Sequence, residues 1–421
     1  MEAGPVTSVR PDGLVGALMA AEGFEGVETV LHGPGGCRFR YMRLAQELYP
    51  RDGALSCPRD RAFYFGSPRI PCTFLDEDDY IYGGSYNLAE ALEEVAKGGS
   101  RMIVIESPAT ALIGDDIQGC ISGHGLEGRA MPFRKHLVSM PMNEGFDELC
   151  REYVEFLSPR KEEKIPGTVN LLGLPILCRD WKGSLEEVSR ILGMMGLRVT
   201  SSIGSGCSYE DVMRSSTAEF DISVFPEFCV STAELYRDRF GIECNSCCFA
   251  PVGFDATKEW IGAVADLTGK DPSDALEYVR RTDMEARRIL RSDPIKASKT
   301  RGMHYCIDAG SSVAYPLVGW LFKYLSMIPD SVRMPYGTDE ARRKTEGMLE
   351  SLHLSSALDA PLENGGLMAS SGDYANMCRL SGMFVRSLDL GFPQSRGFHF
   401  NNGTILGPRG AMNILSSIYN V

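Results

Sequence analysis

Two cysteines near the start of the chain lie in settings that suit metal chemistry. Residues 30–37 have the sequence VLHGPGGC, in which an apolar run ends in a glycine-rich turn that leads to Cys37. Backbone amides of such a turn can approach an anion closely, and they lower the pKa of a neighbouring thiol. The turn is not a P-loop, because no Lys-Ser or Lys-Thr pair follows the glycines. Cys37 is therefore either a ligand or a buried cysteine in a tight turn.

Two further segments carry candidate residues, and the second of them follows a predicted strand. Residues 71–84 are PCTFLDEDDYIYGG, where Cys72 precedes an acidic run and a double glycine. Residues 103–117 are IVIESPATALIGDDI, where a buried strand ends at a turn and Gly-Asp-Asp opens the next helix. Ligands of open α/β sheets bind at these carboxyl ends of strands. An acidic run on its own is usually a solvated face, so none of these segments indicates a function alone.

The elements that would position these residues follow a repeating pattern of short apolar runs and amphipathic helices. Predicted strands lie at residues 102–105, 169–174, 197–199, 221–225 and 302–307. Continuous apolar strands that alternate with helices indicate parallel sheets covered on both faces, and therefore an α/β fold. In the helix predicted for residues 184–195, Ser184 and Glu187 are spaced as a capping box, which predicts that the helix begins there.

Two polar segments that contain proline are typical of linkers between compact units, residues 158–166 and 291–301. They divide the chain into three α/β domains of similar size, 1–165, 166–297 and 298–421.

Composition excludes several classes of protein. The 421 residues are 43% hydrophobic and 24% charged, which is typical of a globular chain. A net charge of -13 argues against binding nucleic acid, which needs a basic surface. No apolar stretch approaches the roughly 20 residues of a membrane span, and the N-terminus lacks the apolar core of a signal peptide, so we expect a cytoplasmic protein. Thirteen cysteines, an odd number, argue against a disulfide framework.

The three segments belong to a longer series of motifs in a fixed order. The series is HGPGGC, CTFLDEDDYIYGG, LIGDDI, FGIECNSCCFAPVGFDAT, LMASSGDY and GFPQSRGFHFNNGTILGPRGAMNIL. Together they resemble the component 1 subunits of nitrogenase and its relatives over nearly the whole chain, and the first and last parts resemble the β-type subunit. The resemblance implies three Rossmann-like domains with parallel sheets around a central cleft.

The resemblance also implies an iron–sulfur cluster at an interface with a partner subunit. Cys37 and Cys72 fall on two of the family's ligand positions, and Gly36 adjoins the first. Thiolates are the usual ligands of such clusters. The family's third cysteine is replaced by Pro108, which puts a larger, P-cluster-like eight-iron cluster in doubt. A 4Fe-4S cluster held by Cys37 and Cys72 of two chains fits the residues, and Cys57 is a further candidate ligand, or equally a loop cysteine.

The other cysteines and histidines have weaker signals. Cys244, Cys247 and Cys248 are spaced as C-x-x-C-C, which suits a metal, but they fall on a predicted strand and are better interpreted as buried strand cysteines. His32 is part of the first motif and is expected to hydrogen-bond the turn. His399, in the C-terminal motif, is a candidate proton donor or ligand, with a surface histidine as the alternative.

The resemblance implies a subunit of a two-component reductase. Since the chain has no Walker A motif, ATP hydrolysis would reside in a separate iron protein that passes electrons to the cluster, and from there to a substrate or a second metallocofactor in the cleft. The partner subunit would complete a homodimer or an α2β2-type heterotetramer. The missing third cysteine argues against dinitrogen as the substrate. Open alternatives are a non-catalytic scaffold for metallocofactor assembly, a subunit of a tetrapyrrole reductive cyclase, and a structural subunit without a cluster.

Overall fold

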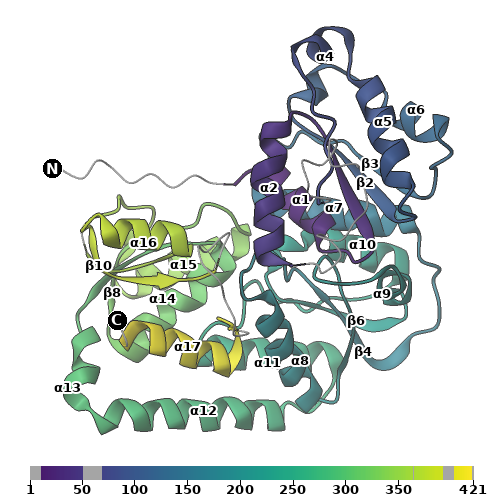
Figure 1. Cartoon of the computed structure of the whole chain (residues 1–421). Helices are drawn as coiled ribbons and strands as arrows, with labels where there is room; N and C mark the ends of the chain where they lie inside the picture. Colours follow the sequence, from purple (N-terminus) through teal and green to yellow (C-terminus); the bar gives the residue numbers. More distant parts are fainter. Residues whose placement is uncertain (1–10, 51–68, 364, 392–402, 420–421) are drawn as a thin grey trace. The chain divides into compact units, whose positions relative to one another are not determined.

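The computed structural model describes residues 11–50, 69–363, 365–391 and 403–419. The chain divides into two compact units, drawn in Figure 1. The N-terminal unit comprises Pro11–Glu162 and Ser201–Ser216, and the C-terminal unit comprises Glu163–Thr200 and Thr217–Val421, with Met1–Arg10 outside the described residues. One unit boundary lies within the polar segment 158–166. The division into three domains stays a prediction.

The N-terminal unit is built on a parallel sheet with the strand order β1-β2-β3. Its strands are β1 (Val27–His32), β2 (Arg101–Glu106) and β3 (Ala130–Phe133). Its helices are α1 (Gly13–Glu22), α2 (Gly35–Leu48), α4 (Glu77–Tyr82), α5 (Ser85–Ala96), α6 (Ile117–Gly123), α7 (Met142–Leu157) and α9 (Tyr209–Ser215). The register pairs His32 with Glu106, so both strands end at the same edge of the sheet.

Apolar side chains from both element types form the core of this unit. Val30 of β1 and Val104 of β2 pack against Leu88 and Leu92 of α5, and all four are fully buried. On the other side, α1 and α7 approach backbone to backbone. A Cβ atom at Gly16 would lie 1.9 Å from the Met142 carbonyl oxygen, so only glycine permits this contact.

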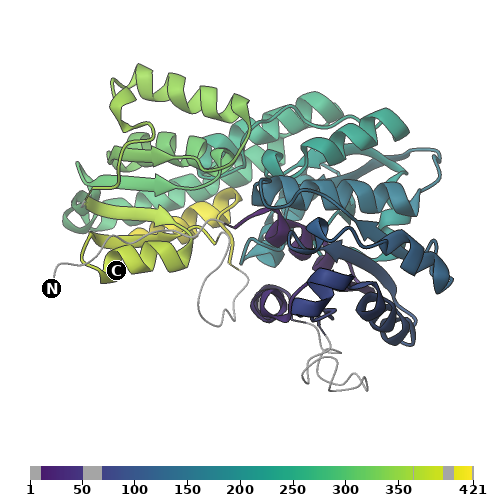
Figure 2. The same ribbon diagram turned by 90° about the horizontal axis from the view of Figure 1, so that it is seen from above.

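The C-terminal unit holds two sheets, with the orders β5-β4-β6 and β10-β9-β7-β8. The strands are β4 (Ile165–Leu172), β5 (Arg198–Ser202), β6 (Ala218–Ser223), β7 (His304–Asp308), β8 (Ile328–Arg333), β9 (Gly365–Ser370) and β10 (Phe384–Asp389). The helices are α8 (Trp181–Met194), α10 (Val230–Phe240), α11 (Phe254–Thr268), α12 (Ser273–Ser292), α13 (Pro294–Ala297), α14 (Ser311–Leu325), α15 (Asp339–Ser351), α16 (Gly372–Leu380) and α17 (Gly407–Tyr419). Figure 2 shows the strands of the second sheet with helices on both sides.

The architecture confirms the predicted α/β class with three parallel sheets, but two local predictions are wrong. The helix predicted to begin at Ser184 begins at Trp181, with Asp180 at the N-cap position. Ser184 therefore lies inside the helix, where its hydroxyl is 2.9 Å from that of Thr404. The segment around Cys244 makes a single isolated bridge to Asp221 and is not a strand.

Candidate functional site

A buried hydrogen-bond network surrounds the turn that follows β1. The imidazole of His32, the last residue of β1, lies between two partners: Nδ1 is 3.1 Å from Thr73 Oγ1 and Nε2 is 2.9 Å from Asp115 Oδ2. The Gly33 amide donates to the same Thr73 hydroxyl at 2.9 Å. His32 is fully buried and Thr73 and Asp115 nearly so. The network thus joins the three motifs HGPGGC, CTFLDEDDYIYGG and LIGDDI, which are far apart in the sequence.

The chemistry of the partners fixes the tautomer of His32. An ionised carboxylate only accepts hydrogen bonds, so Nε2 carries the proton that is donated to Asp115, and Nδ1 accepts from the Thr73 hydroxyl. Burial lowers the pKa of His32 below its ordinary value and outweighs the opposing effect of Asp115. The imidazole is therefore neutral near pH 7 and acts as a structural connector, as expected for His32 from the sequence.

Asp115 is the centre of the network. Its carboxylate accepts hydrogen bonds from the Gly84 amide at 2.9 Å and the Ser85 hydroxyl at 2.9 Å, besides that from His32. Burial raises the pKa of Asp115, but the hydrogen bonds from His32, Ser85 and Gly84 together hold it below its ordinary value. The close approach requires glycine, because a Cβ at Gly84 would lie 2.6 Å from the Leu75 side chain and 3.1 Å from Asp115.

Cys72 lies directly against the same turn. It forms a parallel bridge with Leu31 of β1 and is fully buried within the chain. Its Sγ donates to the Gly33 carbonyl at 3.0 Å and accepts from the Phe74 amide at 3.4 Å. Amide hydrogen bonds to sulfur help to set the reduction potential of an iron–sulfur cluster. The surroundings of Cys72 therefore suit a metal-bound thiolate as well as a free thiol.

Cys37 is the third residue of α2, which begins at Gly35. Its side chain lies outside the described part of the structure. The first turn of a helix lowers the pKa of a thiol, because the unpaired amides there favour negative charge. A Cβ at Gly35 would lie 2.4 Å from the Phe74 ring, whereas one at Gly36 would meet nothing within 4 Å. Packing therefore demands glycine at position 35 and not at Gly36.

The backbone on both sides of Cys72 is strained. Ile70 and Phe74 have φ angles of 50° and 51°, in the left-handed region that β-branched and bulky residues avoid. The buried guanidinium of Arg38 donates through Nε to the Ile70 carbonyl at 2.8 Å and lies 5.6 Å from the centre of the Phe74 ring. Such strain persists where the surroundings hold it in place, and it concentrates at functional sites.

Buried arginines near the two cysteines are the main feature that sequence reasoning missed. Arg38 directly follows Cys37, and Arg69, three residues before Cys72, forms a buried ion pair with Glu22. Glu22 also accepts from the Thr29 hydroxyl at 2.6 Å. The sequence feature that could have pointed to these arginines is a basic residue close to each predicted ligand, because nearby positive charge stabilises a thiolate.

The turn after β2, where the resemblance implies a third ligand, carries no thiol: Pro108 stands there. The Ser107 amide donates to the His32 carbonyl at 2.9 Å, so Pro108, the next residue, follows the end of β2 beside the end of β1. The next cysteine, Cys120 of α6, is half-buried, and burial raises the pKa of its thiol. Within the described ranges, no group of three or more His, Cys, Asp or Glu side chains is placed to hold a metal ion.

Two other predicted site residues, Cys57 and His399, lie outside the described residues. Gly391 and Gly403 are the described residues on either side of the His399 segment, and both lie against the two residues that precede α8. The Gly391 carbonyl accepts from the Arg179 amide at 2.9 Å, and a Cβ at Gly403 would lie 2.9 Å from Asp180.

The C-x-x-C-C cysteines are partly or fully buried. Cys247 and Cys248 are buried and Cys244 is half-buried. Burial raises the pKa of the Cys247 thiol to about 12. These thiols are protonated at neutral pH, which favours their interpretation as buried cysteines.

A second buried acid lies in the C-terminal unit, just beyond the end of β6. Ser312, in the first turn of α14, donates to Glu227 Oε1 at 2.8 Å. Burial raises the pKa of Glu227 to about 7, against the opposing effect of Ser312. Glu227 is thus a buried acid with a raised pKa that follows the end of β6 and contacts the start of α14, and α/β proteins bind ligands at such carboxyl ends of strands.

Comparison with known proteins identifies the family of this chain. The sequence profile for the nitrogenase component 1 type oxidoreductase family matches residues 13–421. The chain belongs to this family. Among its relatives, the B subunit of the light-independent protochlorophyllide reductase of Acidiphilium rubrum is 27% identical over 281 residues, covering 65% of this chain and 53% of that protein. The chain therefore spans about half the length of this relative.

Two further similarities extend over nearly the whole chain. The nitrogenase molybdenum-iron protein beta chain of Bradyrhizobium diazoefficiens is 21% identical over 468 residues, covering 98% of this chain and 83% of that protein. The solved structure titled "Nitrogenase Cp1 at pH 6.5" superposes with a TM-score of 0.76 at 16% identity, covering 99% of this chain and 93% of that chain. The fold of this nitrogenase component 1 family member is thus that of nitrogenase chains. Among the described residues, none of its helices is both long and apolar enough to cross a membrane.

Proposed function

We propose that this family member is a subunit of a two-component reductase that receives electrons from an ATP-hydrolysing iron protein through an interface iron–sulfur cluster. The observation that carries the proposal is the buried network of His32, Thr73 and Asp115. It fixes the segment of Cys72 against the turn that leads to Cys37. A rigid scaffold of this kind is what a cluster ligand needs, because outer hydrogen bonds orient the ligands and tune the cluster.

The donor set fits a 4Fe-4S cluster shared by two chains. Cys37 and Cys72 of one chain supply two thiolates, and a homologous subunit would supply two more, in a homodimer or an α2β2-type heterotetramer. The cluster would supply one-electron transfer. With Pro108 on the third turn, a larger P-cluster-like centre would need Cys57 or additional ligands from the partner. We place this chemistry in the cytoplasm, where thiols stay reduced.

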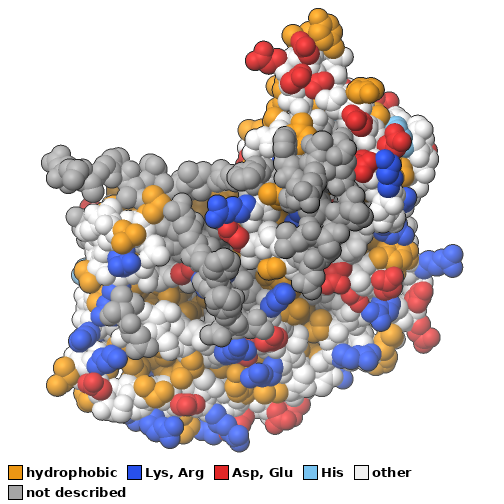
Figure 3. All heavy atoms as spheres, in the orientation of Figure 1, with side chains coloured by type: hydrophobic (Ala, Val, Ile, Leu, Met, Phe, Trp, Pro, Cys, Tyr) orange, Lys and Arg blue, Asp and Glu red, His pale blue; other side chains and the backbone are white. Residues whose placement is uncertain are grey.

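The surface beside Cys72 suits the docking of an electron donor. Helix α4 exposes Ile81 and Tyr82, at 71% and 83% of their surface, and Tyr86 at the start of α5 is 79% exposed. The acidic residues at the start of α4 lie next to them. Figure 3 shows acidic and apolar side chains together at the end of the N-terminal unit where Figure 1 draws α4. A contiguous exposed apolar patch with a charged rim is typical of an interaction site.

The substrate would be reduced in the C-terminal unit. Glu227, with its pKa near neutrality, is the described group best suited to deliver protons there, and His399 remains a second candidate. The absence of a third cysteine near Pro108 favours a substrate other than dinitrogen, such as a tetrapyrrole or another small molecule. A second metallocofactor is an alternative acceptor of the electrons.

Electron transfer with an isolated iron protein tests the proposal. The chain is purified anaerobically with its native partner subunit and mixed with reduced iron protein, with and without ATP. We expect oxidation of the iron protein only when ATP is present. At sub-saturating iron protein it should be slower in Tyr82→Asp but not in Val138→Asp, which changes a residue that is 67% exposed and lies outside the three motifs. A cluster that is present but never reduced by the iron protein would indicate the assembly scaffold instead.

A further inference from the structure

Arg38 connects the two segments that carry the predicted cluster ligands. It follows Cys37 at the start of α2, and its guanidinium reaches the segment of Cys72. Nε donates to the Ile70 carbonyl at 2.8 Å, and Nη2 lies 3.5 Å from the Arg69 carbonyl. Arg38 is nearly fully buried, at 2% exposure. Because a long cationic side chain is seldom buried without specific contacts, the fold holds this guanidinium in one place.

The ring of Phe74 makes a second contact between the same two segments. A Cβ atom at Gly35, the first residue of α2, would lie 2.4 Å from this ring, and the central guanidinium carbon of Arg38 lies 5.6 Å from the ring centre. The ring therefore packs on α2 through residues on both sides of Cys37. Arginine suits this position, because its planar guanidinium stacks on an aromatic ring while it donates hydrogen bonds.

The backbone that Arg38 contacts is the strained backbone on either side of Cys72. The φ angles of 50° at Ile70 and 51° at Phe74 persist only where the surroundings hold them. In this conformation the Phe74 amide donates to the Cys72 sulfur at 3.4 Å. Loss of the Arg38 contacts would let the segment relax and would release the amide from the sulfur.

We propose that Arg38 is a positioning residue for the iron–sulfur cluster: it fixes the Cys72 segment on the start of α2 and keeps the Phe74 amide on the Cys72 sulfur. This role rests on the proposed function, in which Cys37 and Cys72 are ligands of one cluster. Retention of the cluster then depends on Arg38 through the spacing of the two ligands. The reduction potential depends on Arg38 through the amide hydrogen bond to sulfur.

A purely structural role for Arg38 leads to a different result. An arginine that only stabilises the fold lowers the melting temperature of the cluster-free chain when it is removed, and the cluster in folded molecules keeps its potential. A positioning residue changes the potential and the EPR spectrum of the cluster itself. The two roles are therefore separated by spectroscopy of the folded protein.

The test uses the full-length chain, purified anaerobically with its native partner subunit, and compares the wild type with Arg38→Met and Arg43→Met. Arg43 belongs to the same helix, but its side chain is 74% exposed and pairs with Glu47. We expect a ferrous chelator to remove iron about tenfold faster from Arg38→Met than from the wild type, because loss of an outer partner weakens metal binding by about 10–100-fold. The midpoint potential of Arg38→Met in an EPR-monitored titration should be more negative, since hydrogen bonds to sulfur stabilise the reduced cluster. Arg43→Met should behave as the wild type does.

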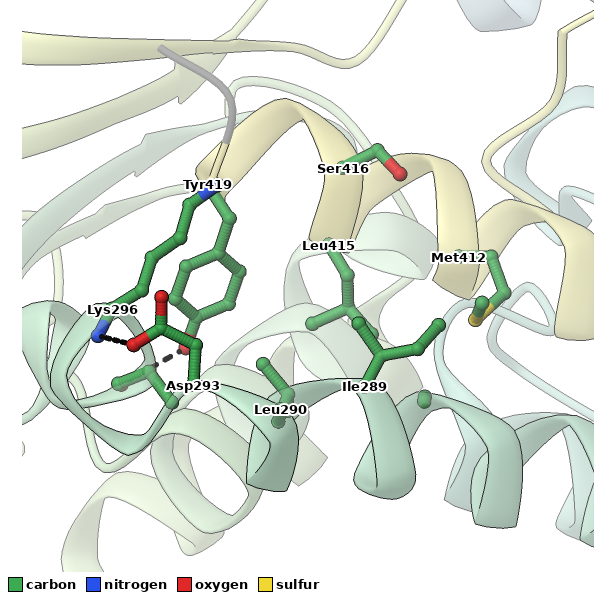
Figure 4. A pocket seen from close by; sticks show the side chains of 10 residues that line it. Ile289, Leu290, Asp293, Lys296, Met412, Leu415, Ser416 and Tyr419 are labelled. Carbon is green, nitrogen blue, oxygen red and sulfur yellow. Dashed lines mark hydrogen bonds between the residues drawn. The ribbon is translucent and has the colours of Figure 1, made fainter.

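Two further variants sharpen the comparison. Arg38→Lys should recover part of the effect, because an ammonium can donate to the Ile70 carbonyl but cannot stack flat on the Phe74 ring. Leu415→Ala is the control for lost stability. Leu415 is buried on α17, and Figure 4 shows it facing α12 across a cavity in the C-terminal unit. This variant should lower the melting temperature and leave the potential of the cluster unchanged.

Phe74→Leu tests the same contact independently and keeps the proposal testable if Arg38→Met does not fold. It removes the ring between Gly35 and Arg38 but keeps the amide. We expect faster loss of iron and a more negative potential, as in Arg38→Met.

Two outcomes would overturn the role of Arg38. One is a wild-type rate of iron loss and a wild-type potential in every folded variant of Arg38 and Phe74. The other is a lowered melting temperature of Arg38→Met with an unchanged EPR spectrum and potential, which is the result of a structural role. A wild type that holds no iron would instead contradict the proposed function itself, so the two failures are distinguishable.

Discussion

Removal of the Asp115 carboxylate gives the sharpest test of the buried network. In Asp115→Ala, the His32 Nε2–H and the Gly84 amide lose their acceptor while both remain buried. An unsatisfied buried donor costs about 1–3 kcal/mol, and the lost hydrogen bonds were to a charged group. Together, we expect about 3–5 kcal/mol of destabilisation, a large share of the 5–15 kcal/mol typical of a folded protein.

Asp116→Ala is the matched control for this prediction. Asp116 is the adjacent acid, but it is exposed and caps α6 by accepting from the Gly119 amide at 2.9 Å. Loss of an N-cap of this kind costs about 1 kcal/mol. Urea unfolding of both variants, fitted with a common slope of the transition, measures the difference in their free energies of unfolding. Equal destabilisation of the two variants would refute the assignment of Asp115 as the centre of the network.

Both His32 and Asp115 make the stability of the folded chain depend on pH. His32 has a lowered pKa in the folded chain, so below pH 6.5 the unfolded chain binds a proton that the folded chain resists, and stability falls. Asp115 also has a lowered pKa, so its contribution is present above its unfolded pKa and is lost as pH falls through its folded value. Both groups therefore favour unfolding in acid, and the destabilisation by Asp115→Ala should shrink as pH falls below 4.

Three further predictions follow from single contacts. Gly35→Ala should lower the melting temperature and the iron content, because its Cβ would lie 2.4 Å from the Phe74 ring, while Gly36→Ala should change neither the fold nor the melting temperature. Burial raises the pKa of Asp221 to about 8, so the folded chain holds a proton that the unfolded chain releases above about pH 4, and stability falls as pH rises from 4 to 8. Urea unfolding should therefore show that the free energy of unfolding of Asp221→Asn, relative to that of the wild type, is higher at pH 9 than at pH 6. The same difference between variant and wild type at both pH values would contradict this. Tyr82→Asp should raise the KM for the electron donor in steady-state assays without lowering iron content, and an unchanged KM would exclude α4 from docking.

The fold class could be predicted from the sequence because buried parallel strands leave a local signal. Strand β2 is a continuous apolar run, and its burial pattern follows from the helices on both faces. Helix starts were less predictable. Ser184 and Glu187 have the spacing of a capping box, but both are buried, and packing of the helix against the C-terminal part of the chain moved its start to Trp181.

The residues of the candidate site were only partly predictable, because the contacts between them are long-range. The motif Gly-Asp-Asp does not indicate which acid turns inward. In the structure Gly114 has a φ of 77°, Asp115 enters the core and Asp116 caps α6. The partner of Asp115 is 83 residues away in the sequence, at His32, so no local pattern could have paired them. The roles of Arg38 and Arg69 depend in the same way on tertiary packing.

Iron and sulfide content is the measurement that tests the central claim most directly. The wild type, Cys72→Ala and Cys378→Ala would be purified anaerobically with their native partners, and the reduced proteins examined by EPR. Cys378 is a buried cysteine of the C-terminal unit and serves as the control for loss of a thiol. A 4Fe-4S cluster shared by two like chains predicts about two irons per chain in the wild type and in Cys378→Ala, and none in Cys72→Ala. Iron that is absent from the wild type, or unchanged in Cys72→Ala, would contradict the account.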